Sequence, residues 1–146
     1  MGNELWKPSE QRISDSLMAK FMRETGVGLA SGRPDFEALW RFSVDRPADF
    51  WNAVWDFCGI VGDKGNTVIR KAERIMDTRF FPDARLNFAE NLLKHRGGAP
   101  AIIWHGEGGG REEWSWDDLV KAVSRLQQAL RAEGVGPGDR VAGYLP

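Results

Sequence analysis

Two glycine-rich stretches are the first places in this sequence that could bind a phosphate group. Residues 105–111 read HGEGGGR. A phosphate-binding loop presents backbone N–H groups at the start of a helix and is usually followed by a Lys and then a Ser or Thr. Here the glycines lead into Glu112 and Trp114, which is a strand pattern, and the sequence contains no Lys-Ser or Lys-Thr pair. We therefore predict that residues 105–111 form a hairpin turn.

The second stretch, residues 134–139, reads GVGPGD. A dinucleotide-binding fingerprint lies after a strand and before a helix. The flanking pattern here is the reverse, with helical spacing before the glycines and an apolar strand pattern after them. We therefore predict that this stretch stops a helix and forms a turn.

The residue types that most often bind metals or act as nucleophiles are few and scattered. His95 and His105 are the two histidines, and Cys58 is the one cysteine, so no internal disulfide can form. No spacing of His, Cys and carboxylate residues matches a metal site, and no Ser-His-Asp order can be argued. We predict local packing or solvent roles for the histidines, and we assign no catalytic, cofactor-binding or metal-binding residue.

Residues 36–57 are rich in Trp and Phe, which are enriched among the anchors of protein interfaces. Their three-to-four spacing is equally that of the buried stripe of a helix. We favour packing against the body of the same polypeptide, and we keep a non-catalytic interaction module built on residues 35–58 as an alternative. Arg70, Lys71 and Arg74 form a modest basic cluster that we interpret as a solvated face.

The overall composition is that of a globular protein, with 42% hydrophobic and 28% charged residues. A net charge of −1 creates no strong field that would attract nucleic acid or an anionic membrane. The first ten residues lack the apolar core of a secretory signal peptide. No apolar run approaches the roughly 20 residues that cross a bilayer. We predict a cytoplasmic protein without a nucleic-acid or membrane partner.

The positions of the apolar residues and of the glycines and prolines predict mainly helices before residue 96. Ser9 can cap the first helix, Gly26 can end it, and Pro47 can both separate the next two helices and begin the second of them. Two short helices joined in this way predict an αα-hairpin. The predicted helices cover 9–25, 35–45, 47–58 and 84–95, with a linker over 26–34 and Asp83 as the cap of the last helix.

The last third of the chain predicts a β-hairpin followed by a helix. Ser115 and Asp118 have the spacing of a capping box at the start of that helix. The predicted elements are strands over 101–105 and 111–115, a helix over 116–133 and a strand over 141–145. Because the last strand runs to the end of the sequence without a following element, we expect that the chain is truncated within a larger domain.

Three segments resemble one enzyme family. Residues 38–57 (ALWRFSVDRPADFWNAVWDF) resemble the N-terminal helical segment of acetyl- and acetoacetyl-CoA synthetases, and residues 79–93 (RFFPDARLNFAENLL) are similar to the segment that leads into their large domain. Residues 114–146 resemble the first helix and strand of the whole adenylate-forming superfamily. The resemblance runs from about residue 4 to the end, and the extended N-terminal portion favours the acetoacetyl branch.

This resemblance implies an ATP-dependent acid–thiol ligase that acts in lipid metabolism and ketone-body utilisation. A carboxylate, acetoacetate in this branch, attacks the α-phosphate of ATP to give an acyl-adenylate and pyrophosphate, and the thiol of CoA then displaces AMP. The family's cofactors are ATP, Mg²⁺ and CoA. Its phosphate loop, its adenine-and-ribose segment and its C-terminal lysine have no match in this sequence. The implied role is therefore structural, with the rest of the same polypeptide as the partner and no activity of the chain alone.

The expected fold class is α/β, with an N-terminal helical arm followed by the first hairpin, helix and strand of the large domain of an adenylate-forming enzyme. We divide the chain into an N-terminal helix and linker (1–34), the helical region typical of acetyl- and acetoacetyl-CoA synthetases (35–95) and the truncated start of the AMP-binding large domain (96–146). The alternatives are a part of an acetyl- or propionyl-CoA synthetase, or the non-catalytic interaction module.

The isolated 146-residue chain is expected to bind Mg-ATP no better than an unrelated globular protein of similar size, because the family's phosphate-binding motifs have no match in it. Isothermal titration calorimetry of the two proteins side by side measures this. Saturable binding of Mg-ATP at micromolar concentration by the chain alone would contradict the prediction.

Overall fold

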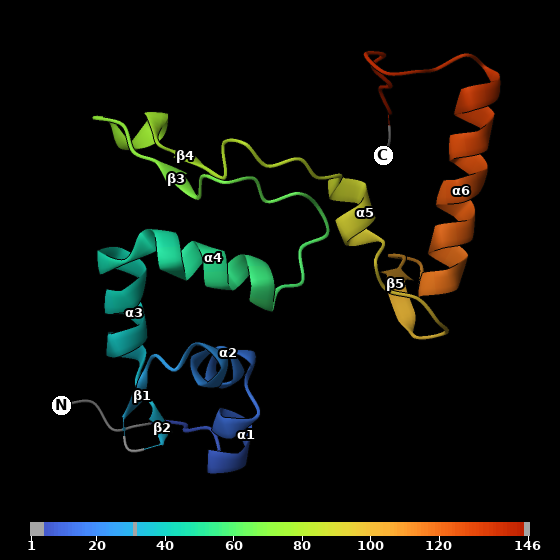
Figure 1. Cartoon of the computed structure of the whole chain (residues 1–146). Coiled ribbons are helices and arrows are strands. Elements are labelled where there is room, and N and C mark those ends of the chain that lie inside the picture. The colour runs from blue at the N-terminus through green and yellow to red at the C-terminus, as the bar shows by residue number, and fades with distance from the viewer. Residues whose placement is uncertain (1–4, 31, 145–146) are drawn as a thin grey trace. The chain divides into compact units, whose positions relative to one another are not determined.

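The computed structural model describes residues 5–30 and 32–144 (Figure 1). The chain forms two units, one that ends at Asn87 and one that begins at Phe88. Helices dominate the first unit, and a β-hairpin followed by a long helix dominates the second. This mixture of helices and strands agrees with the predicted fold class.

The first predicted helix is two helices, α1 (Glu10–Ser14) and α2 (Leu17–Thr25). The break has a local cause, because the hydroxyl oxygen of Ser16 accepts a hydrogen bond from the N–H of Ala19 at 3.1 Å and so caps a new helix. α2 ends at Gly26, which adopts the predicted left-handed conformation with φ 68°. The prediction of one continuous helix was therefore wrong, although both of its ends were placed correctly.

The next two helices follow the sequence pattern closely. α3 (Phe36–Asp45) is capped by the carboxylate of Asp35, and α4 (Pro47–Phe57) begins with the proline. Arg46 is the single residue between them. Figure 1 shows α4 running across the end of α3 rather than back alongside it, so the pair is not the predicted αα-hairpin. One linking residue is shorter than the two to five that a helical hairpin uses.

The stretch that composition marked as a linker forms a small β-hairpin, β1 (Leu29–Ala30) and β2 (Arg33–Pro34). Gly28 starts it with φ 76° and packs closely. A Cβ there would lie 3.0 Å from the carbonyl oxygen of Asp35 and 3.2 Å from the side chain of Met22. The glycine is needed because the chain turns directly against the core.

The core of the first unit lies among α2, α3 and α4. Phe21, Met22 and Leu39 are buried, and half-buried aromatic and aliphatic side chains of α3 and α4 pack around them. The ring of Phe21 meets those of Phe57 and Phe50 edge to face, at centroid distances of 5.1 and 5.8 Å. Such pairs add about 0.5–1.5 kcal/mol to the gain from burial. The helical stripe read from the sequence is therefore a core stripe along part of its length.

A second small hairpin completes the first unit. Its strands are β3 (Ile69–Arg70) and β4 (Arg79–Phe80), and a short 3-10 helix, η1 (Ile75–Asp77), lies between them. The segment after the hairpin returns to the loop that follows α4. Asp63 and Arg85 each donate the backbone N–H to the other's carbonyl oxygen at 2.8 Å.

This backbone pair explains why the helix predicted over 84–95 was wrong. Arg85 is held in an isolated β-bridge to Asp63, and the helix, α5 (Phe88–Leu92), begins only at Phe88. Asp83, the predicted cap, instead lies 3.6 Å from the guanidinium of Arg70. A long-range bridge has overridden a local helical preference.

The second unit confirms most of the predictions for the last third. β5 (Pro100–His105) and β6 (Arg111–Ser115) pair antiparallel, and α6 (Trp116–Ala132) follows directly. Gly134 stops the helix with φ 83°. Residues 141–144 do not form the predicted strand, and Leu145 lies outside the described residues. A strand needs a partner for its backbone groups, and none of the described strands pairs with this segment.

The start of α6 carries the predicted capping box. The Ser115 hydroxyl donates to the Asp118 carboxylate at 2.5 Å, and the N–H of Asp118 donates back to that hydroxyl oxygen at 3.1 Å. The hydrogen bond from the Ser115 side chain, helped by the one from its backbone N–H, lowers the pKa of Asp118 below the ordinary 3.8. The cap therefore stabilises the helix above that pH and is lost as the pH falls through the lowered pKa.

Replacing Gly62 by Ala is expected to destabilise the first unit by about 3 kcal/mol, because its φ is 154° and a Cβ would lie 2.6 Å from the Cβ of Leu86. Gly26→Ala is the matched control. It also has a positive φ but no atom within 4 Å, so a smaller cost of about 1 kcal/mol is expected. Urea unfolding followed by circular dichroism compares the two, and equal costs would show that the contact with Leu86 does not matter.

Candidate functional site

The glycine-rich loop at 106–110 is a tight hairpin turn, as predicted. The N–H of Gly106 donates to the carbonyl oxygen of Gly110 at 2.8 Å, and the N–H of Gly109 donates to that of Gly106 at 3.0 Å. The indole of Trp104 lies against the loop, and a Cβ at Gly106 would come within 2.5 Å of it. The glycines therefore make room for a tryptophan ring. The N–H groups of Gly106 and Gly109, which could otherwise bind an anion, already donate hydrogen bonds within the turn.

The stretch at 134–139 is also explained by local structure. Val135 donates its N–H to the carbonyl oxygen of Leu130 at 3.0 Å, which closes the end of α6. The carboxylate of Asp139 accepts the N–H of Gly136 at 2.7 Å. The N–H of Gly136 is therefore already used within the loop, and the prediction of a helix stop with a turn is confirmed.

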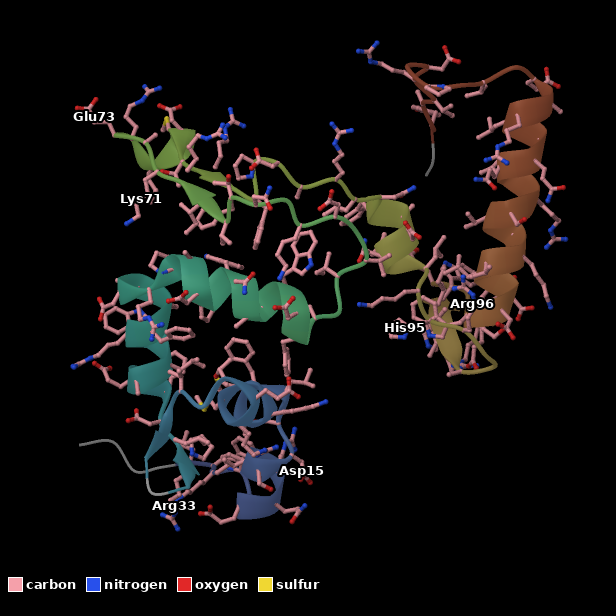
Figure 2. All side chains as sticks on the ribbon, in the orientation of Figure 1. Asp15, Arg33, Lys71, Glu73, His95 and Arg96 are labelled. Carbon is pink, nitrogen blue, oxygen red and sulfur yellow. The ribbon has the colours of Figure 1, made fainter. Side chains whose placement is uncertain are left out.

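Both histidines belong to the second unit, and the cysteine belongs to the first. His95 packs on the ring of Trp116 at a centroid distance of 5.0 Å, next to Arg96 (Figure 2). His105 pairs with Arg111 in the β5–β6 hairpin, and Cys58 is exposed at the end of α4. No group of three His, Cys, Asp or Glu residues in the described part of the chain could hold a metal ion.

The basic cluster lies on the β3–β4 hairpin, at whose outer end Figure 2 shows Lys71 and Glu73. Arg74 pairs with Asp77 at 2.7 Å, and the Arg74 side chain is 71% exposed. Together with the contact between Arg70 and Asp83, this pairing leaves a surface of mixed charge. It fits the interpretation of a solvated face.

A lysine that the sequence analysis did not single out joins two parts of the first unit. The ammonium of Lys64 donates to Asn52 at 2.9 Å and to Asp56 at 2.6 Å, both on α4. It also lies 5.9 Å from the ring centre of Trp55. The Lys64 side chain is 25% exposed, so the three contacts clamp the loop onto α4. The partners lie 8 to 12 residues away in sequence, which is why no short motif revealed them.

One hollow of about 490 Å³ lies beside α2, α3 and α4. Its floor includes the rings of Phe21, Phe42 and Phe57, and acidic residues stand at its rim. Asp49 is paired with Arg46 at 2.7 Å, and Asp56 with Lys64. Two of the acidic side chains that line the hollow are therefore already paired with basic ones.

Comparison with known proteins shows what this chain is similar to. Residues 36–92 match the family model described as the acetyl-coenzyme A synthetase N-terminus. The chain is 44% identical over 142 residues to the acetoacetyl-coenzyme A synthetase of Rhizobium meliloti (strain 1021), covering 97% of this chain and 22% of that protein. It is 34% identical over 148 residues to the acetoacetyl-CoA synthetase of Xenopus tropicalis, with 97% and 21% covered.

A solved structure of an acetoacetyl-CoA synthetase is also similar to this chain. The acetoacetyl-CoA synthetase from Streptomyces lividans superposes with a TM-score of 0.80 at 32% sequence identity, over 99% of this chain and 23% of that one. The chain is related over nearly its whole length to the N-terminal part of acetoacetyl-CoA synthetases. It spans about a fifth of the length of the relatives that it matches.

The region that matches the family model contains most of the elements of the first unit. The residues that match the acetyl-coenzyme A synthetase N-terminus cover α3, α4, the β3–β4 hairpin and α5. No helix in the described residues is both long and apolar enough to cross a membrane. The acetoacetyl-CoA synthetase resemblance inferred from residues 38–57 and 79–93 is confirmed.

Substituting Gly106 by Ala is expected to push the indole of Trp104 off the loop, because the added Cβ would lie 2.5 Å from the ring. Gly108→Ala is the control, since nothing lies within 4 Å of its Cβ position. In ¹H–¹⁵N spectra the indole N–H signal of Trp104 should shift in the first variant and stay in place in the second. A shift of that signal when inorganic phosphate is added to the unmodified chain would show that the loop binds an anion after all.

Proposed function

We propose that this chain is the N-terminal part of an acetoacetate–CoA ligase and that its role there is structural. The supporting observation is the match of 97% of the chain, at 44% identity, to an acetoacetyl-coenzyme A synthetase that is several times longer. The arrangement of the side chains fits this role. The candidate phosphate loops close their own turns, Arg70 and Arg74 pair with carboxylates, and aromatic rings pack among the helices of the first unit.

The chemistry of the whole enzyme requires catalytic and ligand-binding groups, and we propose that the rest of the polypeptide supplies them. A carboxylate is a poor electrophile until it carries a good leaving group, so acetoacetate is first joined to AMP, and CoA then replaces the AMP. Neutralising the phosphates of ATP needs Mg²⁺ and basic side chains. ATP, Mg²⁺, CoA and acetoacetate are therefore proposed to bind the rest of the same polypeptide, in the cytoplasm, and this chain is proposed to be inactive alone.

The proposed structural role is to supply packing surface. Besides the core side chains, α3 and α4 present aromatic residues to solvent, among them Phe36 at 65% and Trp40 at 51% exposure. Large exposed aromatic side chains indicate contact with another surface. The interaction-module alternative invokes the same side chains, but the whole-chain similarity to a ligase favours the body of the enzyme as their partner.

A second candidate substrate is acetate. The family model that matches residues 36–92 is that of the acetyl-coenzyme A synthetase N-terminus, so the helical region alone does not separate the two branches. The acetoacetyl-CoA synthetases of Rhizobium meliloti and Xenopus tropicalis each match nearly the whole chain. For that reason we rank acetoacetate first, and acetate or propionate second.

The test is an assay of the longest in-frame polypeptide that contains residues 1–146. With ATP, Mg²⁺ and CoA it should release AMP and form a thioester, and acetoacetate should be preferred over acetate and propionate by at least about tenfold in kcat/KM, which corresponds to about 1.4 kcal/mol. Preference for acetate would favour the second candidate. A reading frame that ends without ligase activity would support the interaction module instead.

A further inference from the structure

Among the described residues, Phe81 is the one residue other than glycine whose φ is positive, at 46°. A side chain with a Cβ disfavours this left-handed conformation. The residue that follows is Pro82, and a proline restricts the residue before it to extended conformations. Two features of the sequence thus oppose the conformation that Phe81 adopts, so contacts from elsewhere in the fold must hold it.

Two tertiary contacts hold Phe81 in place. Its N–H donates to the carbonyl oxygen of Val68 at 2.8 Å. Its ring packs on the indole of Trp55, on α4, at a centroid distance of 4.9 Å. Both partners lie outside the turn that contains Phe81, so the turn does not hold this conformation by itself.

The conformation of Phe81 sets the direction in which the chain continues. Phe81 lies between β4, which ends at Phe80, and a turn that the N–H of Ala84 closes by donating to the carbonyl oxygen of Phe81 at 3.0 Å. After this turn, Arg85 and Asp63 exchange two backbone hydrogen bonds of 2.8 Å. An extended Phe81 would direct the turn elsewhere and separate this pair.

The two segments that the pair joins fit closely against each other. A Cβ at Gly62 would lie 2.6 Å from the Cβ of Leu86, and a Cβ at Gly65 would lie 2.7 Å from the Cβ of Asp83. Closely packed surfaces tend to change between discrete arrangements rather than to deform gradually. Residues 82–86 are therefore expected to be either seated on the loop 62–65 or released from it.

Lys64 connects this region to α4 in two ways. Its ammonium lies 5.9 Å from the ring centre of Trp55, the same indole on which Phe81 packs. It also donates two hydrogen bonds to other side chains of α4. Because Lys64 directly follows Asp63, one side chain secures both the indole and the loop.

We propose that Phe81 is a conformational latch that Lys64 controls through Trp55. In the closed state, the positive φ directs residues 82–86 onto the loop 62–65. In the open state, Phe81 takes the extended conformation that Pro82 favours, and residues 82–86 leave the loop. This segment leads to the end of the first unit at Asn87. The latch is independent of the proposed function, because all of its contacts lie within that unit.

Two substitutions at Phe81 separate the ring contact from the backbone strain. Phe81→Ala removes the ring and keeps the strain, so the Arg85 amide of the 146-residue chain should exchange with solvent at least about tenfold faster. Phe81→Gly also removes the ring but adopts a positive φ freely, so exchange should be about threefold slower than in the alanine variant. Exchange in the glycine variant that equals or exceeds that in the alanine variant would overturn the proposal, as would an alanine variant that exchanges like the unmodified chain.

Lys64→Met tests the control by the lysine, because methionine keeps an apolar side chain and loses the contacts of the ammonium. The Arg85 amide should again exchange at least about tenfold faster. The nuclear Overhauser effect between the amide and α protons of Phe81, which is strong only when φ is positive, should weaken. Lys71→Met is the matched control, since Lys71 is exposed, and it should change neither measurement.

The amides of α4 in the same Lys64→Met sample distinguish opening of the latch from other effects, and they should keep their protection. Fast exchange at Arg85 with an unchanged Phe81 signal would mean that Lys64 only anchors the loop, which overturns the coupling. Amides of α4 that exchange as fast as Arg85 would mean that Lys64 holds the whole unit together, which overturns the latch as well.

Discussion

The edge-to-face contacts of Phe21 with Phe50 and Phe57 are the interaction on which the N-terminal unit depends. They fasten α2 onto α4, and Met22 and Leu39 are buried beside them. Further ring contacts extend from α4 to the β3–β4 hairpin, from Trp51 to Phe80 at 5.6 Å and from Trp55 to Phe81 at 4.9 Å. The aromatic side chains thus connect helices to a hairpin that is too short to be stable by itself.

One residue in this network is held in an unfavourable conformation. Phe81 has a φ of 46°, which costs a residue with a Cβ about 1–2 kcal/mol. Its N–H donates to the carbonyl oxygen of Val68 at 2.8 Å, and its ring packs on Trp55, so these two contacts offset the cost. Lys64 secures the loop on the same side of α4 with two hydrogen bonds. The region between α4 and α5 is therefore ordered by tertiary contacts despite having little regular structure.

The polar groups of the two glycine-rich stretches are used in local hydrogen bonds. In the described residues, the glycine loops close their own turns, and Asp49 and Asp56 of the hollow pair with Arg46 and Lys64. Groups that are satisfied in this way are poor candidates for binding phosphate. The exposed apolar side chains, in contrast, are not buried by neighbouring residues. The proposed structural contribution to a larger ligase is consistent with both observations. The N-terminal unit has its own core, and no described residue of the C-terminal unit is buried.

The sequence by itself determined the features that depend on near neighbours. These are the caps at Ser9 and Ser115, the break at Pro47, the β5–β6 hairpin and the family resemblance. Short-range rules suffice there, because the groups that interact lie within a few residues of one another. Tertiary structure decided the rest. The bridge between Asp63 and Arg85 prevented a predicted helix, the clamp of Lys64 on α4 carried no sequence signal, and residues 141–144 formed no strand. Each of these outcomes depends on a partner distant in sequence, whose presence or absence no local pattern encodes.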